Sequence, residues 1–288
     1  MTNLTKETQE NIKRIESLID HSFTIKNGIP IPSWIELSLI DFCNRKCVFC
    51  PKGNNTIAPN QKDLYMHINL LHKIAKDLYD INFQGTIMLA GYGEPMLYPL
   101  IIDAIQILSQ VSHVEMCTNG DLLSIKKINQ MNNCGLSFLI VNIYDGPNQK
   151  ISFKKMFNTT NFSKYILRDR WYNSEKDFGI KLTNRAGVIN VGNQPTVNQN
   201  TECFYPHYSM TIDWNGDVLL CPQDWHRRIK CGNIAFNSIY DLWVSKTYKK
   251  YRKLLFKGER SIFPCSSCNC TGTLHGRKHA EKWHDNKH

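Results

Sequence analysis

Three cysteines lie close together in the first fifth of this 288-residue chain, as Cys43, Cys47 and Cys50. They follow the apolar run Trp34–Ile40, which predicts a strand, so their thiolates should converge on one loop at its end. Three thiolates can bind three irons of a [4Fe–4S] cube and leave the fourth iron open for chemistry. Structural zinc is the alternative, but it normally has four ligands, and residues 51–60 supply no further Cys or His. The spacing therefore favours an iron–sulfur cluster with an open iron.

A second set of four cysteines lies nearer the carboxyl end of the chain: Cys203, Cys221, Cys265 and Cys268. The spacing C-x12-G-x4-C, with Gly216 between the first two, followed by a distant C-x2-C, would place a hairpin pair beside a loop pair. Four thiolates suit a second iron–sulfur cluster, but two cysteine pairs suit closed tetrahedral zinc equally well. Cys270 could replace Cys268 as a ligand. The residues alone leave cluster and zinc open.

Composition narrows the class of protein. The start of the chain lacks the basic and apolar regions of a secretory signal, and no apolar run is long enough to span a membrane, so we expect a soluble, cytoplasmic protein with no membrane partner. Eleven cysteines in such a protein indicate metal ligation rather than disulfides. Lys and Arg exceed Asp and Glu, 35 against 25, partly through Lys246–Lys257. This basic run is typical of a solvated face, and it would also suit an acidic flavodoxin or ferredoxin.

The elements that must position the first cysteines form an α/β pattern. Residues Glu7–Leu18 have the apolar spacing of an amphipathic lead-in helix. From Trp34 onward, apolar β-type runs alternate with helical patterns, which predicts βαβ units and a parallel sheet, a partial (β/α)6 TIM-like barrel. Its six expected strands are Trp34–Ile40, Thr86–Ala90, Val114–Cys117, Phe138–Ile143, Tyr165–Leu167 and Ile180–Thr183. Active sites in such folds lie at the carboxyl ends of the strands, which is where the first three cysteines are expected.

The chain is expected to divide into three parts: a lead-in at residues 1–32, the barrel at 33–190, and a small Cys-rich α+β unit with a basic tail at 191–288. The polar stretch Val191–Asn200 reads as the linker. The last unit should open with a hairpin, Ser209–Asp213 and Asp217–Leu220, around the turn pair Asn215-Gly216. A helix over Ser238–Leu255 should then lead to the C-x2-C pair.

The C-x3-C-x2-C run, with the aromatic Phe49 before its last cysteine, resembles the signature of the radical S-adenosylmethionine superfamily. The segment Gly91-Tyr92-Gly93-Glu94-Pro95 is similar to the glycine–glutamate motif that binds the amino group of S-adenosylmethionine in that family. The resemblance implies S-adenosylmethionine bound on the open iron of the first cluster. It implies that Phe49, Gly91, Gly93, Glu94 and Asn142 bind this cofactor. A reduced cluster would then cleave it to a 5′-deoxyadenosyl radical, which abstracts hydrogen from a substrate carbon.

The second cysteine set resembles the C-terminal extension of radical enzymes called SPASM, in its shorter twitch form. The resemblance implies one auxiliary [4Fe–4S] cluster held by Cys203, Cys221, Cys265 and Cys268. The longer SPASM pattern continues with more cysteines, and here only Cys270 follows at a different spacing. A second auxiliary cluster is therefore not expected.

Among twitch enzymes, the spacing is similar to that of the 2-deoxy-scyllo-inosamine dehydrogenase type, in which an aminocyclitol alcohol is oxidised. The resemblance implies a small-molecule substrate, namely a sugar, aminocyclitol or polyol, and an auxiliary cluster that accepts an electron. Arg185, Tyr92 and Asp224 are the candidate substrate contacts, with Arg185 orienting the substrate oxygen because a guanidinium is a poor base. The family carries a carboxylate two residues after the cysteine, where this chain has Gln223.

Three alternatives stay open at this point. One is a peptide-modifying enzyme, as many SPASM relatives are, although the residues before Trp34 are too few for a separate peptide-recognition domain. Another is a redox-neutral epimerase, in which Cys231 returns hydrogen to the substrate. A zinc-stabilised module that binds nucleic acid has only the basic run Lys246–Lys257 in its support, so no nucleic-acid partner is expected.

Overall fold

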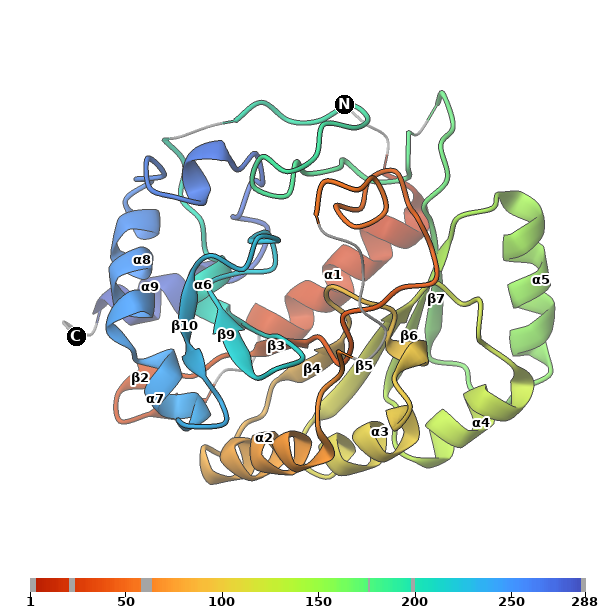
Figure 1. The fold of residues 1–288 in the computed structure, drawn as a ribbon, viewed down its shortest axis with the longest axis horizontal. Coiled ribbons are helices and arrows are strands. Elements are labelled where there is room, and N and C mark those ends of the chain that lie inside the picture. Colours follow the sequence, from red (N-terminus) through yellow and green to blue (C-terminus); the bar gives the residue numbers. More distant parts are fainter. Residues whose placement is uncertain (1–3, 21–23, 58–63, 176, 198–199, 286–288) are drawn as a thin grey trace.

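An eight-stranded sheet forms the centre of the computed structural model, which describes residues 4–20, 24–57, 64–175, 177–197 and 200–285 (Figure 1). The strand order is β10-β9-β8-β3-β4-β5-β6-β7. Strands β8 to β7 in this order run parallel, and β9 and β10 extend one edge antiparallel. The strands span Trp34–Leu37 (β3), Thr86–Leu89 (β4), His113–Thr118 (β5), Phe138–Ile143 (β6), Tyr165–Asp169 (β7), Ser209–Ile212 (β8), Asp217–Leu219 (β9) and Lys230–Asn233 (β10).

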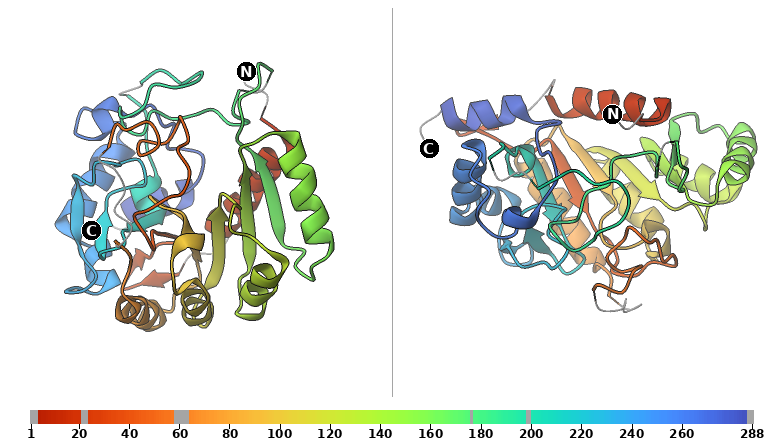
Figure 2. Two further views of the ribbon diagram at one scale, coloured as in Figure 1. Left: turned by 45° about the vertical axis from the view of Figure 1, so that its right-hand side comes forward. Right: turned by 90° about the horizontal axis from the view of Figure 1, so that it is seen from above.

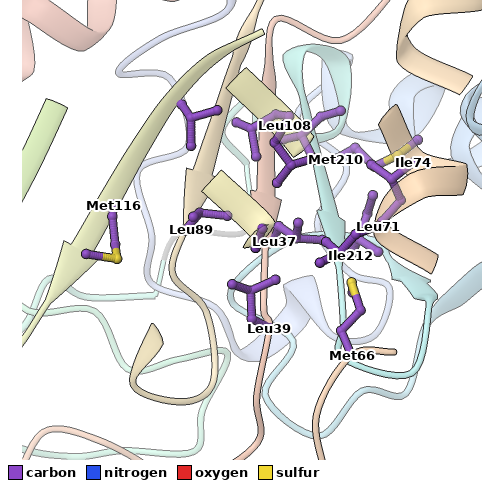
Figure 3. Close-up of a cluster of buried hydrophobic side chains, with 14 of the residues drawn as sticks. Leu37, Leu39, Met66, Leu71, Ile74, Leu89, Leu108, Met116, Met210 and Ile212 are labelled. Carbon is purple, nitrogen blue, oxygen red and sulfur yellow. The ribbon is translucent and has the colours of Figure 1, made fainter. Parts of the chain in front are cut away.

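One face of the sheet is covered by the helices that connect the parallel strands. These are α2 (Ile68–Asp80), α3 (Ile101–Ser109), α4 (Ile125–Asn133) and α5 (Pro147–Asn158). Leu71, Ile74 and Leu78 recur at helical spacing in α2 and are fully buried. Figure 3 shows such side chains meeting alternate residues of the strands, among them Leu37, Leu89 and Ile212. The barrel's outer layer is therefore a continuous apolar core.

The opposite, inner face of the sheet is covered at the amino ends of the strands by α1 (Lys6–Asp20) and α9 (Arg277–Asp285), which lie end to end in Figure 2. Ile19 of α1 and Ala280 of α9 pack with inner-face residues of the strands. The ion pair between Arg14 of α1 and the buried Glu115 of β5 fixes α1 there. The carboxyl ends of the strands stay free for the site.

The remaining elements complete the fold. They are β1 (Ile25–Lys26), β2 (Ile29–Pro30), α6 (Tyr205–Tyr208), α7 (Ile239–Trp243), α8 (Lys246–Phe256) and the 3₁₀ turns Pro95–Leu97 and Cys265–Ser267. Figure 1 shows α6, α7 and α8 beside the edge formed by β8, β9 and β10. In the described part of the chain, no helix is both long and apolar enough to cross a membrane.

The partial barrel of six parallel strands is confirmed, but its sixth strand was assigned to the wrong segment. Residues 180–183 form no strand, and β8 takes the sixth place by pairing with β3. The polar residues at this point bond to other partners: the Thr183 hydroxyl donates to Gln223 at 2.9 Å, and the Asn184 amide donates to Asn269 at 2.7 Å. These bonds attach the segment to the Cys-rich part of the chain instead of the sheet edge.

The predicted lead-in helix and hairpin are confirmed as α1 and as β8–β9, with Gly216 at φ +85° in the turn. The single helix predicted over Ser238–Leu255 is wrong, because two separate helices, α7 and α8, form there. The first helix ends at Trp243 with Val244 as its C-cap, and Ser245 caps the second by accepting a hydrogen bond from the Tyr248 amide. The boundary predicted after residue 190 stays a prediction, and β8 belongs to the barrel's own sheet.

Candidate active site and metal centres

The loop that carries the first three cysteines is fixed to the ends of two strands. Arg45 binds Asp121, after β5, through two of its nitrogens at 2.7 and 2.5 Å. The same guanidinium binds both carboxylate oxygens of Asp145, after β6, at 2.9 and 2.7 Å. Asn44 adds a bond to Asp121 at 2.7 Å. Two carboxylates on one planar guanidinium make a rigid anchor, so the loop has a defined conformation at the barrel mouth.

Cys43, Cys47 and Cys50 are all half-buried and reduced, as a ligand set requires. Burial, and then the nearby thiols of Cys50 and Cys43, raise the pKa of Cys47 to about 12. That mutual influence places the three thiols near one another. The chain turns back directly behind them, since a Cβ at Gly53 would stand 2.3 Å from the Cys47 carbonyl oxygen. These features fit three thiolates around one cluster.

The glycines of the predicted cofactor motif are required by packing against β3 and the segment that follows it. A Cβ at Gly93 would stand 2.1 Å from the Ile40 carbonyl oxygen. Gly91 has φ +100°, and a Cβ there would stand 2.7 Å from the Ser38 side chain. The motif therefore lies directly against the start of the cysteine loop. Cofactor binding by Gly91 and Gly93 stays a prediction that this position favours.

The Glu94 carboxylate is buried and already holds three hydrogen bonds from the protein. Its oxygens accept from the Thr118 hydroxyl at 2.6 Å, the Asn119 amide at 2.8 Å and the Met96 amide at 3.0 Å. Burial raises its pKa despite these bonds. Glu94 thus ties the end of β4 to the end of β5, and its predicted contact with the cofactor's amino group remains untested.

Phe49 is the centre of an aromatic group at the edge of the cysteine loop. Its ring stacks on Tyr144 at 6.1 Å between centroids and meets the edge of Phe178 at 5.3 Å. Tyr144 also lies under the Arg45 guanidinium, 5.0 Å from its ring centroid. Such a platform suits the flat adenine of S-adenosylmethionine, and cofactor binding by Phe49 stays a prediction.

Asn142 lies inside the barrel, where it was expected to contact the cofactor, but its amide has protein partners. It donates to the Cys117 sulfur at 3.3 Å and accepts from Arg168 at 3.1 Å, and Arg168 also donates to Cys117 at 3.0 Å. The neighbouring Arg170 is buried and donates to the Asp169 backbone carbonyl at 2.6 Å. Burial, and then the charge of Arg168, lower the pKa of Arg170 to about 9. This pair of cations inside the barrel favours an anionic ligand group.

The second cysteine set surrounds a single cavity of about 400 Å³, counting open space at its mouth. Five thiols line it, those of Cys203, Cys221, Cys265, Cys268 and Cys270. Elements far apart in the sequence bring them together: the turn before α6, the end of the β9 segment and the 3₁₀ turn Cys265–Ser267. Both cysteine pairs thus converge as the spacing predicted.

A buried cation lies against this cavity. Arg260 is 2% exposed and lines the cavity wall, and its guanidinium donates to the backbone carbonyls of Thr201, Glu202, Cys270 and Thr271. Since all of these acceptors are neutral, its charge is left to be balanced by another group. A [4Fe–4S] cluster with four thiolates is anionic, so the cavity suits a cluster in charge as well as in ligand number.

The zinc alternative fits this geometry poorly. In a zinc site four sulfurs lie about 2.3 Å from one ion and therefore close to one another. Within the described ranges, no three His, Cys, Asp or Glu side chains gather closely enough to hold a single metal ion.

A group of polar side chains lies between the two centres, on the inner face of the barrel. Ile35 and Leu37 belong to the outer core, so Glu36 between them points inward, in register with Thr211 of β8. Burial raises the pKa of Glu36 to about 7, and the charge of Arg185 opposes this shift. The Arg185 guanidinium lies 5.9 Å from the ring centroid of Trp225.

Two buried polar atoms in this group have no protein partner in the described part of the chain. They are the indole nitrogen of Trp225, whose side chain is 8% exposed, and the hydroxyl of Thr211. Buried donors are normally satisfied, so an unpaired indole N–H beside Arg185 and Glu36 indicates the position of a ligand. Arg185, one of the predicted substrate contacts, is therefore in a suitable place.

Tyr92 and Asp224 are brought together, but each is buried and engaged. Tyr92 is 3% exposed, meets Trp225 edge-on at 4.9 Å, and donates its hydroxyl to the Asp224 carbonyl at 3.4 Å. The Asp224 carboxylate, in a residue 1% exposed, accepts from the Ile229 amide at 2.8 Å. In this geometry both residues position Trp225, and their direct contact with substrate stays a prediction.

The sequence-based search missed Glu36, Arg168, Cys117 and Trp225. Glu36 and Arg168 carried a usable signal, because a charged residue inside an apolar β-run must point into a polar interior or bind something. Trp225 carried none, since its position depends on the irregular loop after Cys221.

An iron–sulfur site at the mouth of a partial parallel barrel, with a second Cys-lined cavity beside it, defines an iron–sulfur enzyme of the radical type. Comparison with protein-family models supports this class of enzyme. Residues 37–168 match the model of the Radical SAM superfamily, and residues 203–269 match SPASM, described as an iron–sulfur cluster-binding domain. The chain belongs to the radical SAM superfamily and carries a SPASM domain. Its cofactors are S-adenosylmethionine, the [4Fe–4S] cluster that binds it and an auxiliary cluster.

Known proteins resemble the chain over different lengths. The S-adenosyl-L-methionine-dependent 2-deoxy-scyllo-inosamine dehydrogenase of Niallia circulans is 26% identical over 245 residues, which are 82% of this chain and 92% of that protein. GTP 3′,8-cyclase of Crocosphaera subtropica is 34% identical over 95 residues, 32% of this chain and 28% of its own length. The crystal structure of BtrN in complex with AdoMet and 2-DOIA has a TM-score of 0.73 at 24% identity, covering 86% of this chain and 98% of that one.

Proposed function

We propose that this enzyme dehydrogenates a secondary alcohol of a small sugar, aminocyclitol or polyol. The observation that carries the proposal is the auxiliary cavity, whose thiols are enough to ligate a cluster completely. A fully ligated cluster has no open iron for substrate, so its use is electron transfer, which an oxidation needs. The similarity to the Niallia dehydrogenase over most of both chains supports the same reaction type.

The chain's own side chains can perform the remaining steps. When bound, the cofactors supply a carbon radical that takes the hydrogen atom from the substrate carbinol. Glu36 is the base that takes the hydroxyl proton, because a carboxylate with a pKa of about 7 accepts a proton near neutral pH. Arg185 and the indole N–H of Trp225 orient the substrate oxygen. A cluster held by Cys203, Cys221, Cys265 and Cys268 would supply the acceptor for the electron that remains, so that a ketone is left.

The barrel interior also offers a place for the cofactor's carboxylate. Arg168 is held by Asn142 and Cys117 and lies near enough to Tyr144 for its charge to affect the pKa of that side chain. A guanidinium binds a carboxylate in two parallel bonds. In this arrangement Asn142 positions Arg168.

The test of the proposal is product analysis under anaerobic reduction, with aminocyclitols, amine-free cyclitols and acyclic polyols as candidate substrates. The expected product is two mass units lighter than its substrate and accompanies one 5′-deoxyadenosine per turnover. A product of unchanged mass would contradict dehydrogenation and indicate epimerisation. The Cys231 thiol offers no support for that alternative, because it is 7% exposed and packed in the outer core.

A double variant tests the roles of the two clusters independently. In Cys203→Ala/Cys221→Ala, iron should fall from about eight to about four per chain, while S-adenosylmethionine is still cleaved. Ketone formation should stop, because the second electron has no acceptor. If cleavage also stopped in a folded variant, the electron-acceptor role would be wrong.

The electron donor in this proposal is an acidic flavodoxin or ferredoxin. Five lysines are exposed on α8 or directly after it: Lys246, Lys249, Lys250, Lys253 and, at the C-cap, Lys257. One face of that helix packs inward through Tyr248, Tyr251 and Leu255, so the lysines form a separate basic surface. Charge complementarity between such a surface and an acidic protein accelerates their association.

A further inference from the structure

The auxiliary cavity contains one thiol more than a cubane cluster needs. The SPASM match ends at Asn269, so Cys270 lies just beyond the residues that the family model accounts for. Cys270 nevertheless lines the cavity and is as buried as its neighbour Cys268, each being 8% exposed. The fifth thiol is a feature of this chain that its family assignment does not explain.

Backbone geometry places Cys268 and Cys270 on the same side of their segment. Cys268 ends the 3₁₀ turn in an extended conformation, with φ −85° and ψ 128°. In an extended chain, residues two apart point the same way and the residue between them points the opposite way. Asn269 does so, since its side-chain amide donates to the Pro195 carbonyl at 2.9 Å. Both thiols therefore point into the cavity from one extended segment.

The two thiols differ in their hydrogen-bond partners. The Cys270 backbone amide donates to the Cys268 sulfur at 3.4 Å, a bond that favours the thiolate form and so a ligand. The Cys270 side chain has a bond of the same kind, with the side chain of Tyr205, a wall residue of the cavity. Because the SPASM match includes Cys268 and ends before Cys270, we take Cys268 as the resting ligand and Cys270 as the thiol beside it.

We propose that Cys270 is a reserve ligand of the auxiliary cluster and replaces Cys268 on the same iron when Cys268 is lost or dissociates from it. In the exchange, the iron–sulfur bond to Cys268 breaks and one to Cys270 forms. The proton of the Cys270 thiol passes to the released Cys268 sulfur. No oxidant or reductant takes part, because the cluster keeps four thiolates and its charge. The proposal rests on the SPASM assignment and is independent of the substrate.

The segment after Cys270 is held firmly enough to make such an exchange local. Gly272 has φ +75°, and a Cβ there would stand 2.5 Å from the Cys203 sulfur. Its carbonyl accepts from the Phe204 amide at 2.8 Å. Arg260 fixes the Cys270 carbonyl at 2.6 Å. With the backbone fixed on both sides, only side-chain rotation is needed to bring one sulfur or the other to the iron.

The experiment uses the full chain with Cys43, Cys47 and Cys50 changed to Ala, so that only the auxiliary cluster can bind. Into this background we place Cys268→Ala, Cys270→Ala, or both. Iron, sulfide and the electron paramagnetic resonance spectrum of the reduced protein are measured. Cys231→Ala is the matched control, since that thiol is equally buried but outside the cavity.

Cys268→Ala should keep about four irons with an altered spectrum, Cys270→Ala should keep four with an unaltered one, and the double variant should lose at least one iron. Cys270→Ala should also lose iron several-fold faster in air. The proposal is overturned if Cys268→Ala loses as much iron as the double variant, or if Cys270→Ala alone shows the altered spectrum. Cys268→Ser, which preserves size, repeats the comparison if the Ala variant does not fold.

Discussion

Arg227, six residues after the predicted auxiliary ligand Cys221, forms an ion pair with Asp41, two residues before Cys43, the first predicted ligand of the other cluster. The same guanidinium binds Asp213, just after β8, and lies 4.4 Å from the ring centroid of Tyr92. The buried Lys52 binds the same carboxylate oxygen of Asp41. One arginine therefore connects both cysteine loops, the end of β8 and the glycine motif.

Replacing Arg227 with Met should weaken this connection and the fold. The change leaves the buried Asp213 carboxylate without its cation, and the loss of one partner from a buried pair costs about 3 kcal/mol. The mid-point of anaerobic chemical unfolding should fall accordingly. The exposed Arg228→Met is the control and should change stability little. Equal effects of the two variants would show that Arg227 makes no special connection.

Glu36 should make the stability of the protein depend on pH in a defined direction. Its pKa is raised by burial to about 7 from an ordinary value of 4.5, so the folded state favours the protonated form. This contribution to stability is full below about pH 4.5 and is lost as pH rises through 7. Glu36→Gln should therefore be more stable than the parent at pH 8, by up to about 3 kcal/mol, and similar to it at pH 4.5.

The stability comparison for Glu36 is made by unfolding at both pH values. A variant that is no more stable than the parent at pH 8 would show that the carboxyl is ionised without cost in the folded protein. The same substitution should abolish ketone formation and leave 5′-deoxyadenosine release in place, because a proton acceptor is needed only after hydrogen abstraction.

Reversing charge on α8 should separate protein reductants from chemical ones. In Lys249→Glu/Lys250→Glu/Lys253→Glu, reduction by flavodoxin should slow by about tenfold or more at low salt, because steering between opposite charges is lost. Reduction by dithionite should be unchanged, since it needs no docking. Stopped-flow absorbance of the clusters measures both rates. An unchanged flavodoxin rate would place the docking surface elsewhere.

The parts of this molecule that were predictable from sequence are those governed by local pattern. Apolar β-runs gave five barrel strands, and cysteine spacing gave both ligand sets, because thiolate chemistry restricts which spacings are useful. The turn pair Asn215-Gly216 marked its hairpin for an equally local reason, the positive φ of Gly216.

The parts that failed depend on contacts distant in sequence. Residues 180–183 have β-type composition, but whether they join a sheet is decided by Gln223 and Asn269, which lie far along the chain. The unpaired indole of Trp225 is likewise created by the loop around it. Cys270 was recognised only as a possible substitute ligand, since no spacing rule shows that five thiols line one cavity.

His279 should make the attachment of α9 sensitive to acid. The residue is fully buried, with a ring nitrogen 2.6 Å from the Ser33 hydroxyl. Burial, and then the charge of Arg252, lower its pKa from 6.5 to about 3, so the folded protein holds the neutral form. Its contribution to stability is present above about pH 6.5 and is lost progressively as pH falls toward 3.

At pH 5.5 the parent should lose about 1.4 kcal/mol through this residue relative to pH 7.5. His279→Gln keeps a hydrogen-bonding side chain but cannot be protonated, so its unfolding temperature should fall less over the same range. The exposed His72→Gln is the control and should fall as the parent does. Measurement is by anaerobic calorimetry of the cluster-loaded protein at both pH values. If His279→Gln and the parent lose the same stability, other groups such as the neighbouring His207, whose pKa is also lowered by burial, account for the acid sensitivity.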